Sequence, residues 1–354
     1  MKKWICSLLA LCMILSCAAC GAAPQKNETV LPEQTQETPE TPVKEAAVLN
    51  PLTGEPLKDP TTVNQRPVAV MLNNLKAAMP QMGVSQADVI YEFIVEGGIT
   101  RMMGVFQDIS QLGTIGTIRS ARPCFVETAA GLDAIYVHAG CSDEAQRDLD
   151  AWGIDHLDGC GAAAGLFWRD AARMQSAGLE HSMLTSGANL SGYLPQSGFR
   201  LTRKSDYTAP VTFQADGTPA DGTPASKVTV QFSHYKTGVF TYDAAKGLYK
   251  IEEYDAPYID GNTNEQVGVT NLLVLKTSVV NSGDSSGHMI VDLQGSGSGT
   301  YFCGGKAAQI TWQKNSISDP FTYTLSSGAS FSMGTGHTYV CVISQESSEM
   351  TVEP

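Results

Sequence analysis

The clearest alternation of apolar and polar residues lies between residues 87 and 128. Two alternating runs, ADVIYEFIVE and ITRMMGVFQD, meet at a Gly-Gly pair, which is a strong signal for a β-hairpin. A two-residue turn would place Arg101 diagonally between Glu92 and Glu96, within reach of both carboxylates. The opposite face of this hairpin is apolar and is expected to enter the core.

Further patterns between residues 50 and 207 mix strands with helices. Strands are expected over VAVMLN and DAIYVHAG. Ser142 is a good N-cap for a helix over DEAQRDLDAW, and Gly153 is well placed to end it. A second helix is expected over residues 166–177, with Met174 among its inward-facing side chains. This region is therefore predicted to be an α+β N-terminal domain.

The pattern changes after residues 208–226, which are rich in Pro, Gly, Ala and Thr and are expected to form a linker. Beyond them, runs such as NLLVLKTSV and HTYVCVIS recur at spacings of about ten residues, with Gly or Ser between them. This spacing predicts a mainly antiparallel β C-terminal domain over residues 227–347. The two domains are expected to fold as independent units.

The start of the chain has the pattern of a bacterial lipoprotein signal. Two lysines precede a short apolar run and the sequence AACG, so residues 1–19 are expected to be removed and Cys20 to carry a lipid such as palmitate. Cys17 is a weaker alternative acceptor, and a plain secreted protein is the other alternative. Residues 20–49 are acidic, rich in Pro and Thr, and lack aromatics, which is typical of a disordered tether.

Charge restricts the possible partners. The chain has 36 acidic and 23 basic residues, a formal charge of −13, which argues against nucleic acid as a partner. We expect the protein to sit on the extracytoplasmic face of the cell membrane through its lipid, with a cell-wall component or an exported protein as a further partner. Every arginine lies between Arg66 and Arg203. A fixed cationic site would therefore belong to the N-terminal domain.

Arg119 and Arg122 bracket Ser120 and precede a proline, which favours the first turn of a helix. Two positive side chains at a helix start are unfavourable unless an anion or acid joins them. Because the guanidinium fork suits phosphate and carboxylate, these three residues and Arg101 form a candidate anion-binding site. The alternative is internal pairing with nearby acids: Glu92, Glu96, Glu127 or Asp133.

Glu92, Glu96 and His138, which lies at the end of a predicted strand, are the candidate acid and base groups. A triad of Ser120, His138 and an acid can be drawn, but no G-x-S-x-G motif supports it. More often, a histidine at a strand end is only hydrogen-bonded.

No metal or cofactor is expected. His138-x-x-Cys141 resembles zinc-ligand spacing but lacks a paired C-x-x-C. The glycine-rich GSGSGTYF leads into a predicted strand, whereas a dinucleotide site needs a helix there. Tyrosines such as Tyr301 at strand spacing are candidates for a sugar- or peptide-binding face, although aromatics at this spacing are more often core residues or cross-strand pairs. Whether Cys303 and Cys341 form a disulfide stays open.

Several motifs together resemble the YerB-type lipoproteins of Gram-positive bacteria. They are NPLTG, RPVAVMLNN, EGGITR, IRSARP, DAIYVHAG and a C-terminal segment around ITW. The resemblance covers nearly everything after the tether. It implies a lipid-anchored protein with two family domains of unknown function and supplies no catalytic residues. Two hypotheses follow: a non-catalytic binding or scaffolding protein of the cell envelope, or an envelope enzyme acting on a phosphate- or carboxylate-bearing wall precursor.

Overall fold

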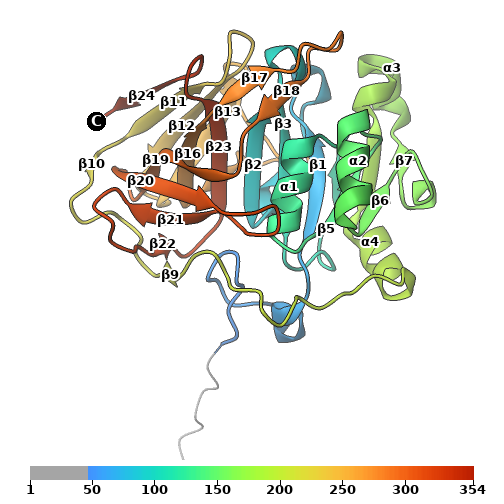
Figure 1. Ribbon diagram of the computed structural model, residues 1–354, viewed down its shortest axis with the longest axis horizontal. Coiled ribbons are helices and arrows are strands. Elements are labelled where there is room, and N and C mark those ends of the chain that lie inside the picture. The colour runs from blue at the N-terminus through green and yellow to red at the C-terminus, as the bar shows by residue number, and fades with distance from the viewer. Residues whose placement is uncertain (1–46) are drawn as a thin grey trace, which may run out of the picture. The chain divides into compact units, whose positions relative to one another are not determined.

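A mixed eleven-stranded sheet runs through the computed structural model, which describes residues 47–354 (Figure 1). The predicted signal peptide, Cys20 and most of the tether lie outside the described residues. The N-terminal region supplies one half of the sheet, in the order β2-β3-β1-β5-β6. Its strands are β1 (Val68–Asn73), β2 (Val89–Ile94), β3 (Thr100–Phe106), β5 (Ile135–His138) and β6 (His156–Asp158).

The C-terminal region supplies the other half, in the order β10-β20-β19-β16-β23, with β21 beside β20. Its strands are β10 (Thr223–Pro224), β16 (Asn271–Thr277), β19 (Gly295–Cys303), β20 (Lys306–Lys314), β21 (Thr322–Leu325) and β23 (Thr338–Ser344). The halves join where β23 runs parallel to β2, from Val89 opposite Thr338 to Phe93 opposite Val342. Both strands are buried throughout, which explains their nearly continuous apolar sequences.

A second sheet covers one face of the main sheet. It has the order β14-β13-β12-β11-β24, with β15 paired to β13. Its strands are β11 (Lys227–Gln231), β12 (Thr237–Asp243), β13 (Leu248–Glu253), β14 (Ala256–Pro257), β15 (Gly268–Val269) and β24 (Glu349–Glu353). Alternate residues such as Val228, Phe240 and Ile251 point inward and pack against Leu272 and Tyr339 of the main sheet.

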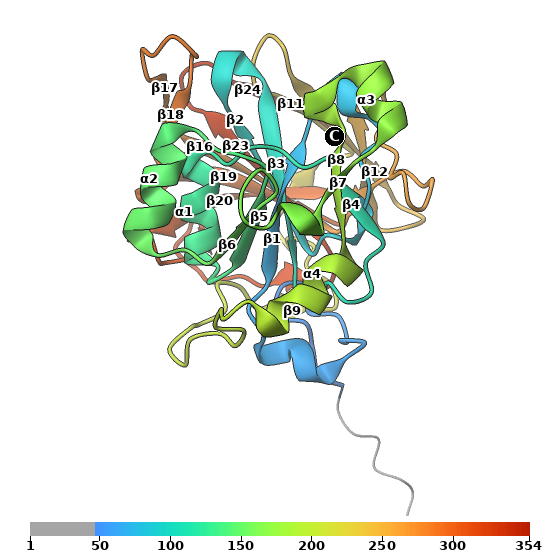
Figure 2. The ribbon, with the colours of Figure 1, turned by 90° about the vertical axis from the view of Figure 1, so that its right-hand side faces the viewer.

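Helices cover the other face. α1 (Pro123–Gly131) and α2 (Asp143–Trp152) bury Phe125 and Leu149 against Phe93 and Tyr136 of the main sheet. Figure 2 shows these two helices on one side of the sheet and β11 and β12 on the other. The remaining elements are α3 (Ala171–Ala177), α4 (Gly187–Tyr193), β4 (Thr114–Gly116), β7 (Trp168–Arg169), β8 (Met183–Ser186), β9 (Phe213–Gln214), β17 (Val279–Asn281), β18 (Met289–Val291) and β22 (Met333–Gly334).

The prediction of a mixed N-terminal region and a mainly antiparallel C-terminal region is confirmed. The α2 prediction is also confirmed at both ends. The Ser142 side chain accepts a hydrogen bond from the Ala145 amide, and Gly153 takes a left-handed conformation with φ of 61°.

The predicted second helix is wrong at its start. A 3₁₀ turn ends at Leu166, and β7 follows it because Trp168 pairs with Leu184 of β8. The helix α3 begins only after β7. Asp170 caps α3 by accepting a hydrogen bond from the Arg173 amide. Met174, predicted to face inward, is exposed.

The expected linker and domain separation also need correction. Within residues 208–226, β9 pairs with β22 and β10 pairs with β20. β24, which lies beyond the predicted domain end at residue 347, pairs with β11. The described chain belongs to one compact unit, Ala46–Pro354, whose main sheet draws strands from both regions. Independent folding of the two regions stays a prediction that the structure does not test, and the sheet that they share argues against it.

The central hairpin forms, but its register differs by one residue from that of a two-residue turn. β2 and β3 pair Glu92 with Met102 and Phe93 with Arg101. Because side chains alternate along a strand, this shift places Arg101 on the opposite face of the sheet from Glu92. The expectation that Arg101 reaches Glu92 is wrong, whereas its contact with Glu96 is confirmed.

Candidate functional site

The N-terminal end of α1 carries a cluster of arginines around one glutamate. Arg122, the residue just before α1, holds the Glu96 carboxylate with two hydrogen bonds of 2.9 and 2.8 Å. Arg101, projecting from β3 on the same face of the sheet, also pairs with Glu96 and donates to the Ser120 carbonyl oxygen at 2.8 Å. Internal pairing, the alternative weighed for these arginines, therefore describes Arg101 and Arg122.

The cluster holds more positive than negative charge. Burial and repulsion from Arg122 lower the pKa of Arg101 to about 9. Burial alone would raise the pKa of Glu96, but the two guanidiniums outweigh it and lower that pKa. Two cations share one carboxylate here, so the end of α1 keeps a net positive charge.

Arg119 lies apart from this pair and borders a pocket. Its guanidinium meets the exposed Glu180 carboxylate at 2.9 Å, while its Nε atom is buried and makes no hydrogen bond. The pocket has a volume of about 360 Å³, and its lining includes Arg119, Ser120, Cys160, Arg169 and Glu180. Two arginines and one glutamate thus border an open space, an arrangement that favours an anion.

Neither Ser120 nor Cys160 has the partners of a nucleophile. Burial and the nearby Asp158 carboxylate raise the pKa of the exposed Cys160 thiol, which keeps it protonated. The Cys160 backbone amide donates to Asp158, which also accepts from the Gly140 amide. Asp158 therefore holds the loops at the pocket rim in place.

His138 is enclosed behind the pocket and does not line it. Its Nδ1 lies 2.8 Å from the Gly140 carbonyl oxygen, and its Nε2 lies 2.9 Å from Nδ1 of His156. Burial lowers the pKa of His138, so the ring is neutral, with Nδ1 donating and Nε2 accepting. Both nitrogens are engaged, and the drawn triad with Ser120 does not form.

Glu92 lies in a separate buried network on the opposite face of the sheet. Its carboxylate accepts hydrogen bonds from Thr100 at 2.6 Å, from Tyr339 at 2.7 Å and from Asn74. The Lys236 ammonium lies 3.6 Å from the same carboxylate. Sequence reasoning grouped Glu92 with the arginines, but the structure separates them.

Lys236 is a buried charged residue that sequence reasoning missed. Its side chain is 1% exposed and pairs with Glu253 as well as Glu92. It also lies 4.7 Å from the centre of the Tyr254 ring. Nothing in the local sequence marks this lysine as buried, because its charge neighbours come from distant strands.

The cysteines within residues 47–354 are free thiols. Cys303 on β19 and Cys341 on β23 are both unpaired. β16 lies between those strands, which puts the two residues at least about 10 Å apart, too far for a disulfide. In the described residues, no cluster of three or more His, Cys, Asp or Glu side chains has the geometry of a metal site. No helix among residues 47–354 is long and apolar enough to cross a bilayer.

This chain belongs to a two-domain family of unknown function. Residues 52–200 match the family described as "Protein of unknown function (DUF3048) N-terminal domain", and residues 228–340 match its C-terminal domain. The resemblance seen in the sequence motifs is thereby confirmed.

Its relatives include a protein from Bacillus subtilis (strain 168) named "Putative lipoprotein YerB". That protein is 31% identical over 324 residues, which cover 89% of this chain and 88% of the relative. The crystal structure of the YerB protein from Bacillus subtilis is similar to this fold, with a TM-score of 0.73 and 27% identity. The likeness covers 86% of this chain and 99% of that one.

Proposed function

We propose that this chain is a lipid-anchored protein of the cell envelope that binds an anionic ligand in the Arg119 pocket. One observation carries the proposal: Arg119 and Arg169 line a pocket where the only acidic residue is Glu180, so two guanidiniums outnumber one carboxylate. The carboxylate that pairs with Arg119 belongs to the exposed Glu180, whereas Arg122 binds the more enclosed Glu96 with two hydrogen bonds. Phosphate and carboxylate are the ligand groups that fit a guanidinium fork.

The ligand we propose is a phosphate- or carboxylate-bearing group of a cell-wall component or of an exported protein. The formal charge of −13 sets this pocket apart as a local positive site on an acidic protein. A lipid on Cys20 would hold the pocket near the outer surface of the membrane.

Binding is preferred to catalysis because the acid and base candidates do not reach the pocket. Glu92 lies across the sheet with its hydrogen bonds satisfied, and His138 has both ring nitrogens engaged. An envelope enzyme would need a proton-transfer group beside the bound anion. None of the pocket-lining residues has such a role supported by its contacts.

Thermal unfolding with inorganic phosphate and pyrophosphate tests the anion site. Both should raise the Tm of the wild-type chain, and Arg119→Gln should abolish the increase. Arg147→Gln is the matched control, since Arg147 is exposed on α2 and pairs only with Glu144. A wild-type Tm that neither anion changes, or an increase that survives in Arg119→Gln, would refute the site.

Metabolic labelling with palmitate tests the anchor. Label should enter the wild type and Cys17→Ala and be absent from Cys20→Ala. Label that persists in Cys20→Ala and disappears in Cys17→Ala would move the anchor to Cys17.

A further inference from the structure

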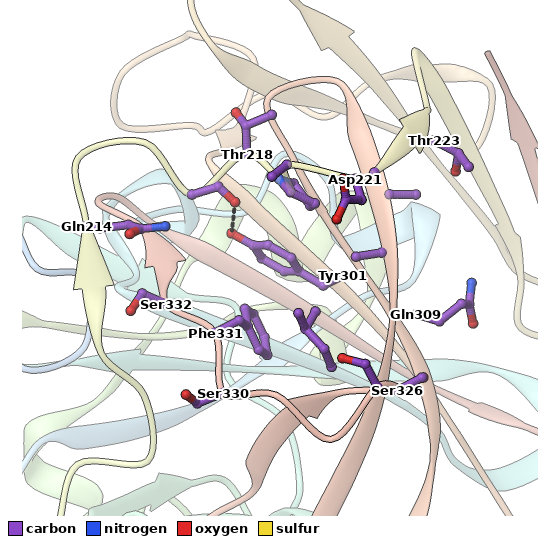
Figure 3. Close-up of a pocket in the computed structure, with 18 of the residues that line it drawn as sticks. Gln214, Thr218, Asp221, Thr223, Tyr301, Gln309, Ser326, Ser330, Phe331 and Ser332 are labelled. Atoms are coloured by element: carbon purple, nitrogen blue, oxygen red, sulfur yellow. Dashed lines mark hydrogen bonds between the residues drawn. The ribbon is translucent and has the colours of Figure 1, made fainter.

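A second cavity lies in the C-terminal half, away from the arginines. Its volume is about 790 Å³, within the range of small-molecule sites, and it shares no lining residue with the Arg119 pocket. Four segments surround it: residues 212–223, β19, the start of β20, and residues 325–332 (Figure 3). The segment expected to be a linker thus forms one wall of this cavity.

Two aromatic rings form the floor of the cavity. The rings of Tyr301 and Phe331 lie side by side, with centroids 4.9 Å apart and planes tilted by 48° (Figure 3). The Tyr301 hydroxyl lies 2.9 Å from Asn271 and 3.2 Å from the Gly217 carbonyl oxygen, and these contacts hold its ring in place. Tyr301 is 1% exposed, whereas Phe331 is only partly buried. Phe331 therefore offers the accessible aromatic surface.

Polar side chains, of which Asp221 is acidic, surround these rings. Figure 3 shows Gln214, Ser330 and Ser332 on one side and Thr218 and Asp221 beyond the Tyr301 ring. Among the described residues, the side chains of Gln214, Asp221 and Ser330 make no hydrogen bond to another protein group. No lysine or arginine lines the cavity. An anion would thus meet Asp221 without a compensating cation, and an apolar ligand would leave the polar rim unpaired.

We propose that this cavity binds a neutral carbohydrate. A sugar ring has one face of C–H bonds, which packs on an aromatic ring, and hydroxyl groups at its edge, which both donate and accept hydrogen bonds. Phe331 supplies the packing surface. The Gln214 amide and the Ser330 hydroxyl can donate and accept, while the Asp221 carboxylate accepts from sugar hydroxyls. An extended peptide is less well suited, since its recognition relies on an open strand edge, and the β20 edges are already paired with β19, β10 and β21.

Calorimetric titration of the full chain, purified in detergent, with tetra-N-acetylchitotetraose and maltotetraose tests this proposal. At least one oligosaccharide should bind with a Kd of about 1 mM or tighter. Phe331→Ala should weaken binding by about tenfold or more, whereas Phe331→Tyr, which keeps the ring, should retain it. Tyr235→Ala is the matched control, because Tyr235 is an exposed aromatic residue outside the cavity.

Ser330→Trp provides a second test that leaves Phe331 intact. The indole should obstruct the cavity beside Phe331 and abolish binding while the Tm stays close to the wild-type value. Arg119→Gln should leave oligosaccharide binding unchanged, which separates this site from the anion site. The proposal is overturned if neither oligosaccharide binds the wild type at millimolar concentration. It is also overturned if binding persists in folded Phe331→Ala and Ser330→Trp.

Discussion

Replacing Lys236 with methionine should reveal how strongly the buried ionic network holds the fold together. The Lys236 ammonium joins Glu92 of β2 to Glu253 of β13, and all three side chains are at most 2% exposed. Methionine keeps most of the volume of the lysine stem but removes its charge. Two carboxylates would then face each other in the interior without a cation.

The expected loss of stability is large. Removing one partner of a buried ion pair costs about 4 kcal/mol, because the other charge stays buried and unpaired. The 3.6 Å separation of Lys236 Nζ and Glu92 Oε1 supports this magnitude. At an effective dielectric constant of about 20, that one contact corresponds to about 5 kcal/mol before desolvation is subtracted.

Urea unfolding followed by circular dichroism should measure this loss at several pH values. In folded Lys236→Met the unpaired carboxylates bind protons more tightly than they do in the unfolded chain. The free energy of unfolding should therefore rise relative to the wild type as the pH falls from 7 towards about 4.5. Adding Glu253→Gln to the variant should restore part of the stability at pH 7.

Lys227→Met is the matched control. Lys227 pairs with Glu353 on the surface, where both side chains are exposed, so its loss should cost less than about 1 kcal/mol. The reasoning is refuted if Lys236→Met costs no more than this control, or if its deficit is the same at pH 4.5 and pH 7.

Three further outcomes are expected. Burial raises the pKa of Asp88 from 3.8 to about 6. The protonated carboxyl therefore stabilises the fold fully below about pH 4, and this stabilisation is lost as the pH rises through 6. Asp88→Asn should remove this dependence in urea titrations across that range, and an unchanged slope would contradict the assignment. Arg122→Gln should lower the free energy of unfolding by about 2 kcal/mol, since it breaks two charge-assisted hydrogen bonds to Glu96. An unchanged free energy of unfolding would indicate that Arg122 is available to bind a ligand. A fragment of residues 50–207 should lack a cooperative unfolding transition, because β2 loses β23; a cooperative transition would show that it folds alone.

Local patterns in the sequence predicted the local elements well. The helix cap at Ser142 and the left-handed Gly153 follow from side-chain chemistry within a few residues, and the sequence displays that chemistry directly. The central hairpin was visible for the same reason. Its register was not, because a Gly-Gly pair permits turns that differ by one residue, and that difference decides whether Arg101 joins Glu92 or Glu96.

Long-range partners could not be predicted. The parallel pairing of Val89 with Thr338 joins residues about 250 positions apart, and neither strand has a sequence feature that identifies the other as its partner. The same holds for the candidate sites. Arg119 meets Glu180 and borders a pocket only because β8 and the preceding loop fold back onto it. Phe331, which follows β21, meets Tyr301 of β19 for a similar reason. A single sequence contains the residues of these sites but does not show which of them lie close together in the fold.

The position of β23 sets an order of events during synthesis. This strand begins at Thr338 of a 354-residue chain, yet it lies between β16 and β2 near the middle of the main sheet. Until it emerges, β2 and β16 each expose an unpaired edge, the kind of surface that recruits strands from other chains. A chain that stops short of β23 therefore loses the join between its two halves as well as a C-terminal strand. The chain must extend through β23 before this sheet can close.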